Sequence, residues 1–271
     1  MSPPTGYRLL CDPLTLFSDT RAGMDAPAVC KHIGVHARGK SAHVLYAWED
    51  LSQRFATIIA RGRGDRALFY RHGATKYNQR NRVSGQHDTR LSDLGRSQAW
   101  ALRDSLPPQI DLILCSTLSR TIETMHLGVP DHLREHAQVY IDARLNEVHL
   151  GKLQGRRRQY VPSFQDGDLD FAPEAGESYR SAAQRVLSLI ADLFDRLADR
   201  SPSPQTAVVF AHAGVMRIIS TLVYDGEGAA DLFRTTHANA ECLAIPAERM
   251  RLPDYWNRTN HVDDTSECHP L

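Results

Sequence analysis

Ala67-Leu68-Phe69-Tyr70-Arg71-His72-Gly73 is the stretch that decides the fold, because four apolar residues lead directly into an arginine, a histidine and a glycine. A second run, Ala207-Val208-Val209-Phe210-Ala211, leads in the same way into His212. Short apolar runs of this length predict buried strands, and ligands in open α/β sheets bind beyond the carboxyl ends of the strands. Two histidines at strand ends, one of them beside an arginine, therefore predict a single anion-binding site.

Strand-like and helix-like segments alternate along the chain around this stretch. We expect strands at residues 67–70, 111–115, 206–211 and 241–245. We expect helices from Ser92 to about residue 106, from about residue 118 onward, and at residues 178–198 and 215–223. Such alternation predicts an α/β fold with three α/β/α layers and a mostly parallel central sheet.

The regions outside this alternation form an extension and a tail. Residues 1–64 are expected to be an N-terminal extension, in which residues 43–60 have the apolar spacing of an amphipathic helix that ends before Gly62 and Gly64. Residues 65–250 are expected to form the α/β domain, and residues 251–271 a polar tail. The extension is expected to pack on the domain or on a partner chain, and the sequence leaves a homodimer open.

The composition argues against several classes of protein. The 271 residues include 32 basic and 32 acidic side chains, so there is no global attraction to nucleic acid or to an anionic membrane. Five irregularly spaced cysteines do not form a disulfide framework and favour a reducing compartment. Neither a signal peptide nor an apolar run of membrane-spanning length is evident. We therefore expect a cytoplasmic protein with no nucleic-acid or membrane partner.

Three strand ends supply groups that cleavage of a phosphate monoester requires. The ester is a dianion, so its site needs fixed positive donors, a nucleophile and an acid for the leaving oxygen. The first strand ends on Arg71 and His72, and the strand at 111–115 leads into a helix with Arg120 about one turn along. His212 follows the third strand at a strand-to-helix turn. Guanidinium groups bind phosphate oxygens through paired hydrogen bonds, and helix N-termini add backbone donors.

A nucleophilic histidine has to keep one ring nitrogen unprotonated. The cationic groups expected around His72 would disfavour its imidazolium form and keep it available. Glu147 is the candidate acid for the leaving oxygen and base for the attacking water. Glu177 could serve in its place, and Glu147 would then be a solvated loop carboxylate.

These residues belong to motifs that follow one another in a recognisable order. The motifs are Arg71-His72-Gly73-Ala74-Thr75-Lys76-Tyr77-Asn78, Asn81-Arg82-Val83-Ser84-Gly85, Ser116-x-Leu118-x-Arg120-Thr121, Leu145-Asn146-Glu147, Gly176-Glu177-Ser178 and His212-Ala213-Gly214. Together they strongly resemble the histidine phosphatase superfamily of phosphoglycerate mutase-like enzymes. The resemblance spans residues 66–245 and implies a phosphoglycerate mutase-like fold, with residues 65–250 as the catalytic domain.

The resemblance also implies a role for each residue. It implies that His72 forms a phosphohistidine, that Glu147 donates the proton, and that the phosphoryl group is bound by Arg71, Arg120 and His212. The substrate-binding set is expected to comprise Asn78, Thr75, Ser84, Gly85, His149 and Ala213. The family works without a metal, and no other cofactor is expected, which fits a phosphate neutralised by arginines.

Two departures from the mutase pattern favour a phosphatase. Val148-His149-Leu150 stands where mutases carry an arginine and a tyrosine that hold phosphoglycerate. Only 28 residues, positions 148–175, separate Glu147 from Gly176, fewer than the substrate-covering segment of mutases contains. Mutases exclude water from the phosphohistidine, so a shorter cover favours hydrolysis of a small phosphorylated metabolite. Phosphoglycerate mutase or sugar bisphosphatase activity, or non-catalytic binding of a phospho-ligand, stay open as alternatives.

Three further patterns have both a functional and a structural interpretation. Residues 34–41 fit the P-loop motif, but the short segment before the first strand leaves no room for a kinase sheet, which favours a chance match or a vestigial loop. Arg156-Arg157-Arg158 is either a solvated face or a site for a second anionic group of the substrate. Four candidate zinc ligands have a spacing that fits no familiar site: Cys30, His32, His36 and His43.

Overall fold

The computed structural model describes residues 45–161, 168–224 and 229–257. Its centre is a five-stranded sheet with the order β3-β2-β4-β1-β5. The strands are β1 (Arg66–Arg71), β2 (Leu112–Cys115), β3 (Gln138–Ile141), β4 (Thr206–Ala211) and β5 (Cys242–Pro246). Neighbouring strands from β3 to β1 are parallel, and β5 runs antiparallel to β1 at the edge. The prediction of a mostly parallel sheet is therefore confirmed.

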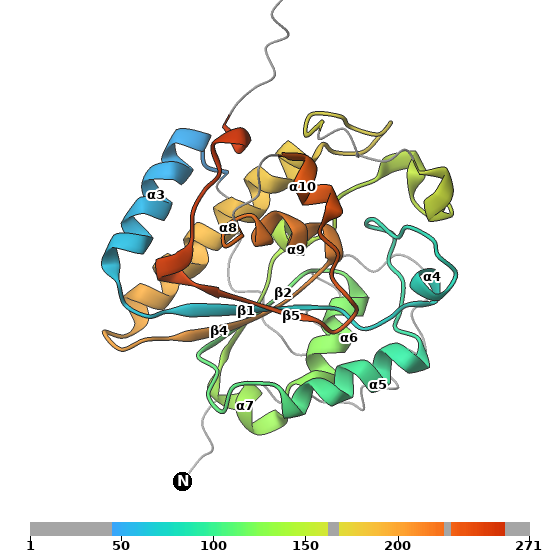
Figure 1. Ribbon diagram of the computed structural model, residues 1–271. Helices are drawn as coiled ribbons and strands as arrows, with labels where there is room; N and C mark the ends of the chain where they lie inside the picture. The colour runs from blue at the N-terminus through green and yellow to red at the C-terminus, as the bar shows by residue number, and fades with distance from the viewer. Residues whose placement is uncertain (1–44, 162–167, 225–228, 258–271) are drawn as a thin grey trace, which may run out of the picture.

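Helices cover both faces of the sheet and complete the three α/β/α layers (Figure 1). One face carries α3 (Trp48–Arg61), α8 (Tyr179–Arg200), α9 (Ala213–Ser220) and α10 (Ala229–Arg234). The other carries α5 (Asp93–Ala101), α6 (Ser119–Gly128) and α7 (Asp131–His136), and the short α4 (Lys76–Gln79) follows β1. Single 3-10 turns lie between these elements: η1 (Leu102–Asp104), η2 (Ala143–Leu145), η3 (Gly151–Leu153), η4 (Arg158–Tyr160), η5 (Ala247–Arg249) and η6 (Asp254–Trp256).

Both faces of the central strands are buried, which explains their continuous apolar sequences. Phe69 and Val209 are paired in register between β1 and β4 and belong to the core that includes α3, α8 and α9. Tyr70 and Phe210, one residue further along, belong to the core on the α6 side, where their rings stack with centroids 5.8 Å apart. A strand exposed on one face alternates apolar and polar residues. These strands are covered by helices on both faces, so they do not alternate.

Several limits differ from the expectations drawn from the sequence. The sequence did not indicate β3, because this strand has four residues at the sheet edge and only Val139 of them is buried. The helix expected to reach residue 106 ends at Ala101, where the chain tightens into η1. Its predicted start is confirmed, since Gly95 N–H donates to the Ser92 side chain at 3.2 Å. Helix α9 begins at Ala213, two residues before the expected start.

Helix α3 joins the expected extension to the core of the α/β domain. Leu51 and Phe55 are 0% and 1% exposed and pack in the same core as α8. On the rim of this contact, Arg54 and Arg61 both form ion pairs with Asp195 of α8, at 2.7 and 2.6 Å. Because exposed ion pairs contribute little, apolar burial provides most of the stabilisation of this contact.

Some of the predicted features lie outside the described residues. These are the P-loop-like segment 34–41 and the candidate zinc ligands Cys30, His32, His36 and His43. Within the described ranges, no set of three or more histidine, cysteine or acidic side chains is arranged to hold a metal ion. None of the helices in these ranges combines the length and apolar character needed to span a membrane.

Candidate active site

The two predicted histidines meet at the carboxyl end of the sheet. His72 follows β1 and His212 follows β4, and because these strands are parallel neighbours the ring centroids lie 5.3 Å apart. His72 is 3% exposed and His212 is fully buried. Arg120, which follows β2 on α6, is also fully buried. The sheet therefore brings the three strand ends to one place, as the sequence predicted.

The ring of His72 is held in one tautomer. Its Nδ1 lies 2.7 Å from the Gly73 carbonyl oxygen, which only accepts, so Nδ1 carries the proton and Nε2 keeps its lone pair. Burial, followed by the charges of Arg120 and Arg71, holds the pKa of His72 well below its usual value. The imidazole is therefore neutral at physiological pH and has the form that a nucleophile requires.

A close approach of the chain after β1 to the first turn of α5 fixes the backbone next to His72. A Cβ atom on Gly73 would lie 2.3 Å from the carbonyl oxygen of Gly95, so glycine is required there. Gly73 N–H donates to Thr124 of α6 at 3.0 Å, and the His72 carbonyl accepts from the Asn239 side chain at 3.0 Å. Contacts from both sides of the strand end therefore hold the nucleophile in place.

Two buried arginines stand beside the nucleophile. Burial lowers the pKa of both Arg71 and Arg120 to about 10, so both remain cationic at neutral pH. Arg120 donates to the carbonyl oxygens of Gly85 and His87 at 2.7 and 2.9 Å, and Arg71 donates to the carbonyl of His237. These bonds leave part of each guanidinium group available and fix its orientation.

Four buried polar atoms around the site have no hydrogen-bond partner among the described residues. They are Arg71 Nε, Arg120 Nε, Ser84 Oγ and His212 Nδ1. Buried polar atoms normally have a partner, so a cluster of unpaired ones indicates a site for a polar ligand. The other ring nitrogen of His212, Nε2, lies 2.7 Å from Ser116 Oγ, a contact that the sequence did not indicate.

The carboxylate of Glu147 lies at the N-terminus of α9. Its Oε1 accepts hydrogen bonds from Gly214 N–H at 3.0 Å and from its neighbour Val148 N–H at 2.9 Å. A Cβ atom on Gly214 would lie 2.4 Å from that oxygen, so a glycine two residues after His212 lets the carboxylate reach the helix N-terminus. This contact places an acid within the same cavity as His72.

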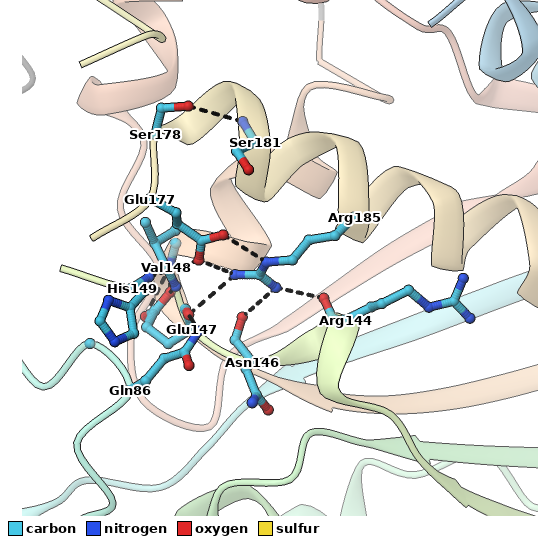
Figure 2. A network of polar contacts seen from close by, with 12 residues as sticks. Gln86, Arg144, Asn146, Glu147, Val148, His149, Glu177, Ser178, Ser181 and Arg185 are labelled. Atoms are coloured by element: carbon cyan, nitrogen blue, oxygen red, sulfur yellow. Dashed lines mark hydrogen bonds and ion pairs between the residues drawn. The ribbon is translucent and has the colours of Figure 1, made fainter. Parts of the chain in front are cut away.

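A network centred on Arg185 holds the backbone of Glu147 (Figure 2). Arg185, from α8, donates to the carbonyl oxygens of Arg144, Asn146 and Glu147 at 2.7, 2.8 and 3.2 Å. Its guanidinium also pairs with both carboxylate oxygens of Glu177, at 2.6 and 3.0 Å. Glu177 is thus occupied in the network, and Glu147 is the carboxylate that lines the cavity.

Arg185 is a residue that sequence reasoning missed, although the sequence contains a signal for it. It stands three residues after Ala182 and four before Leu189, both of which are buried on α8. An arginine on the apolar stripe of an amphipathic helix needs a partner in the interior. The spacing of apolar residues that predicts α8 does not indicate which loop provides that partner.

The site residues line a cavity of about 610 Å³. The predicted residues that line it are Arg71, His72, Asn78, Ser84, Gly85, Arg120, Glu147 and Ala213. His212, whose ring centroid lies 5.3 Å from that of His72, is fully buried and is not among the described lining residues. Thr75 is fully buried as the cap of α4. His149 is not among the described lining residues, and its ring nitrogen Nδ1 accepts from Gly151 N–H at 3.2 Å. Of the three consecutive arginines, Arg158 alone lines the cavity.

Comparisons with known proteins agree with this geometry. A family model described as histidine phosphatase superfamily (branch 1) matches residues 67–252. A glucosyl-3-phosphoglycerate phosphatase of Mycolicibacterium vanbaalenii is 34% identical over 220 residues, which cover 73% of this chain and 96% of that protein. A 2,3-bisphosphoglycerate-dependent phosphoglycerate mutase of Neisseria meningitidis is 26% identical over 204 residues, or 60% of this chain and 86% of that protein.

A solved structure extends the likeness to the fold. The mycobacterial glucosyl-3-phosphoglycerate phosphatase in complex with VO3 has a TM-score of 0.56 and 31% identity to this chain. The match covers 66% of this chain and 92% of the other. The family model, the relatives of near-complete length and the shared fold all point the same way: this chain belongs to the histidine phosphatase superfamily.

Proposed function

We propose that this protein is a phosphomonoesterase that hydrolyses a small phosphorylated metabolite through a phosphohistidine on His72. The state of the His72 ring carries the proposal: Nδ1 donates to the Gly73 carbonyl, so the Nε2 lone pair is free to attack. Arg71 and Arg120 supply the positive charge that a phosphoryl dianion requires. The relationship to a glucosyl-3-phosphoglycerate phosphatase supports hydrolysis.

In the first step, the lone pair of His72 Nε2 attacks phosphorus in line with the ester oxygen. The P–N bond forms as the P–O bond to the leaving group breaks, and a proton passes from the Glu147 carboxyl group to the departing oxygen. The buried arginines stabilise the charge on the phosphoryl oxygens in this loose transition state. When Ser116 donates to Nε2 of His212, Nδ1 of His212 carries a proton and adds a further donor.

In the second step, water releases the phosphoryl group from His72. Glu147, now ionised, takes a proton from the water molecule as the water oxygen bonds to phosphorus. The P–N bond breaks, its electron pair returns to Nε2, and inorganic phosphate leaves. The same carboxyl group is thus acid in one step and base in the next, which requires the fixed position that the Arg185 network provides.

The likeness to relatives favours a sugar phosphate or glycerate phosphate as substrate. The phosphatase relative, named for its action on glucosyl-3-phosphoglycerate, matches over 96% of its length. The mutase relative matches over 86% of its length at 26% identity. We therefore place hydrolysis ahead of phosphoryl return to an acceptor alcohol.

The phosphohistidine can be tested directly. Enzyme quenched at alkaline pH during turnover is expected to contain a peptide with one added phosphoryl group on His72, because phosphohistidine survives base. His72→Asn is expected to lose both this peptide and the release of phosphate from p-nitrophenyl phosphate. Unchanged phosphate release by the variant, measured with inorganic phosphate detection, would reject His72 as nucleophile.

The role of Glu147 can be separated from that of the nucleophile. Glu147→Gln is expected to slow hydrolysis of an alkyl phosphate by about 100-fold to 10,000-fold, because the alkoxide needs a proton on departure. Hydrolysis of p-nitrophenyl phosphate should be slowed far less, because p-nitrophenolate leaves unprotonated. Glu174→Gln, an exposed carboxylate outside the cavity lining, is the matched control. Equal slowing of both substrates by Glu147→Gln would contradict the acid role.

A further inference from the structure

We propose that the turn at residues 237–241 positions both the cationic donor Arg71 and the nucleophile His72, with Glu241 and Asn239 as positioning residues. The inference rests on the proposed phosphatase function and adds residues that lie outside the sequence motifs. None of the five residues of this turn is among the described lining residues of the cavity. Any effect of Glu241 or Asn239 on the reaction therefore has to pass through the residues that the turn holds.

The backbone of the turn extends the pairing of β5 with β1 as far as the site residues. Arg71 N–H donates to the Glu241 carbonyl at 3.0 Å, and Ala240 N–H donates to the Arg71 carbonyl at 3.1 Å. The Asn239 side chain donates to the His72 carbonyl at 3.0 Å. One turn thus holds the backbone of the donor and the backbone of the nucleophile.

The turn also holds the guanidinium group of Arg71. Its Nη1 donates to the His237 carbonyl, whereas its Nε is buried and has no partner among the described residues. A guanidinium group is planar, so a bond at one corner restricts the plane and leaves the edge with Nε for phosphoryl oxygens. A shift of the His237 carbonyl is therefore expected to misalign that edge.

The side chain of Glu241 fixes the position of this carbonyl. Its Oε1 lies 2.9 Å from Nδ1 of His237, and its Oε2 accepts from Ala238 N–H. His237 is 7% exposed, and its other ring nitrogen, Nε2, has no partner among the described residues. Burial of an imidazole with an unpaired nitrogen costs free energy, which indicates a role for its position beside Arg71.

The conformation of Ala240 makes the turn dependent on these contacts. Its φ is +61°, in the left-handed region that favours glycine, and Glu241 N–H donates to the Ala238 carbonyl across the turn at 3.2 Å. A residue other than glycine stays in this conformation only where surrounding contacts fix it. The carboxylate of Glu241 provides such contacts, so its loss is expected to let the turn relax and release Arg71.

Charge also links Glu241 to the donor. Burial lowers the pKa of Arg71 to about 10, and the charges of Glu147 and Glu241 act against this lowering. Although its own partial burial opposes it, the hydrogen bonds from His237 and Ala238 and the charge of Arg71 lower the pKa of Glu241. Glu241 is therefore ionised at neutral pH, within electrostatic range of the guanidinium group that it helps to orient.

A double-mutant cycle tests the link between Glu241 and Arg71. Glu241→Ala is expected to weaken the binding of inorganic vanadate, a mimic of the phosphoryl group in transit, about tenfold in calorimetry, because the donor loses its alignment. In the Arg71→Ala background the same change should cost less than about twofold, because the group that it positions is absent. Glu248→Ala replaces an exposed glutamate just after β5 and is the control, with wild-type affinity expected.

Kinetics separate this role from general destabilisation. Arg71 and His72 act on the phosphoryl group, so Glu241→Ala and Asn239→Ala are each expected to slow p-nitrophenyl phosphate and an alkyl phosphate by the same factor, about tenfold. Loss of the Glu147 acid, by contrast, affects mainly the alkyl phosphate. Glu241→Gln keeps one oxygen acceptor and should retain more activity than Glu241→Ala. Urea unfolding shows whether each variant is folded, and Glu241→Gln and Asn239→Ala provide the test if Glu241→Ala is not.

The outcomes separate the positioning role from the phosphatase function. Phosphate release by the wild type, with unchanged vanadate affinity and rates in the folded variants of Glu241 and Asn239, would overturn the positioning role and leave the phosphatase function standing. An equal loss of vanadate affinity with and without Arg71 would overturn it as well. Vanadate binding that follows the predicted cycle in a wild type that hydrolyses no phosphate ester would support the positioning role and reject the phosphatase function.

Discussion

At the scale of single residues, the site depends on the burial of a neutral imidazole among cations. Burial, followed by the charges of Arg120 and Arg71, lowers the pKa of His72 and opposes its protonation. The hydrogen bond from Nδ1 to the Gly73 carbonyl then selects Nε2 as the reactive atom. The same environment that favours a dianionic ligand therefore also keeps the nucleophile in its reactive form.

This burial has a consequence for stability at acid pH. His72 and His212 both have a pKa well below 6.5 in the folded protein, largely because of burial. In the unfolded chain both take up protons as the pH falls below about 6.5, so the folded state loses stability there. Each such histidine contributes a loss of about 1.4 kcal/mol per pH unit until the folded pKa is reached.

We therefore expect His72→Asn to reduce the pH dependence of unfolding. Below about pH 6.5, its free energy of unfolding in urea should fall less steeply than that of the wild type, by about 1.4 kcal/mol per pH unit. His132→Asn replaces an exposed imidazole and is the control, with the wild-type slope expected. Identical slopes for His72→Asn and the wild type would show that His72 is protonated in the folded state.

At the scale of elements, helix α8 links the sheet to the loop that carries Glu147. Arg185 donates to three backbone carbonyls of that loop and pairs with Glu177, just before the start of the helix (Figure 2). The side chains of this pair are 14% and 18% exposed. A partly buried pair of this kind is costly to break on one side only.

Arg185→Met is expected to destabilise the fold by about 2–3 kcal/mol, because Glu177 and the loop carbonyls lose their donor. The double variant Glu177→Gln/Arg185→Met should be less destabilised than the sum of the single variants, as measured by urea unfolding. The loop also positions Glu147, so alkyl phosphate hydrolysis should fall more than p-nitrophenyl phosphate hydrolysis in Arg185→Met. Additive stabilities together with equal rate losses would contradict the positioning role.

Helix α3 offers a second test at this scale. Leu51 is fully buried, whereas Leu45, just before the helix, is 56% exposed. Leu51→Ala is expected to cost about 3–5 kcal/mol of unfolding free energy, and Leu45→Ala less than about 0.5 kcal/mol. Thermal and urea unfolding measure both. A small effect of Leu51→Ala would mean that α3 is dispensable to the core of the domain.

At the scale of the whole molecule, the strand order β3-β2-β4-β1-β5 determines which site residues meet at the cavity. It makes β1 the parallel neighbour of β4 and β4 the neighbour of β2, so three strand ends meet below one cavity. Only 28 residues separate Glu147 from Gly176, and we expect a segment of this length to form no large cover. Water is therefore expected to reach the phosphohistidine faster than a second alcohol does.

Incubation with 3-phosphoglycerate tests this balance. Phosphorus NMR is expected to show inorganic phosphate and no 2-phosphoglycerate, because the phosphoryl group passes to water. His72→Asn serves as the control and should show neither product. Accumulation of 2-phosphoglycerate ahead of free phosphate would identify the protein as a mutase.

The sequence by itself determined the strands that carry the site. Continuous apolar runs before His72 and His212 mark strands buried on both faces, and parallel strands bring their carboxyl ends to one edge. It indicated β3 poorly, because a four-residue edge strand buries too little to leave a pattern. The helix that contains Arg120 was also evident, since it follows directly on the strand at residues 112–115.

The tertiary structure alone decided between side chains that the sequence left equivalent. It places Glu147 in the cavity and Glu177 against Arg185, and it brings Arg158 to the cavity while Arg157 stays outside the lining. These outcomes depend on contacts between segments far apart in the chain and on the direction in which a loop side chain points. Local periodicity records which face of an element is buried, but carries no information about either of these.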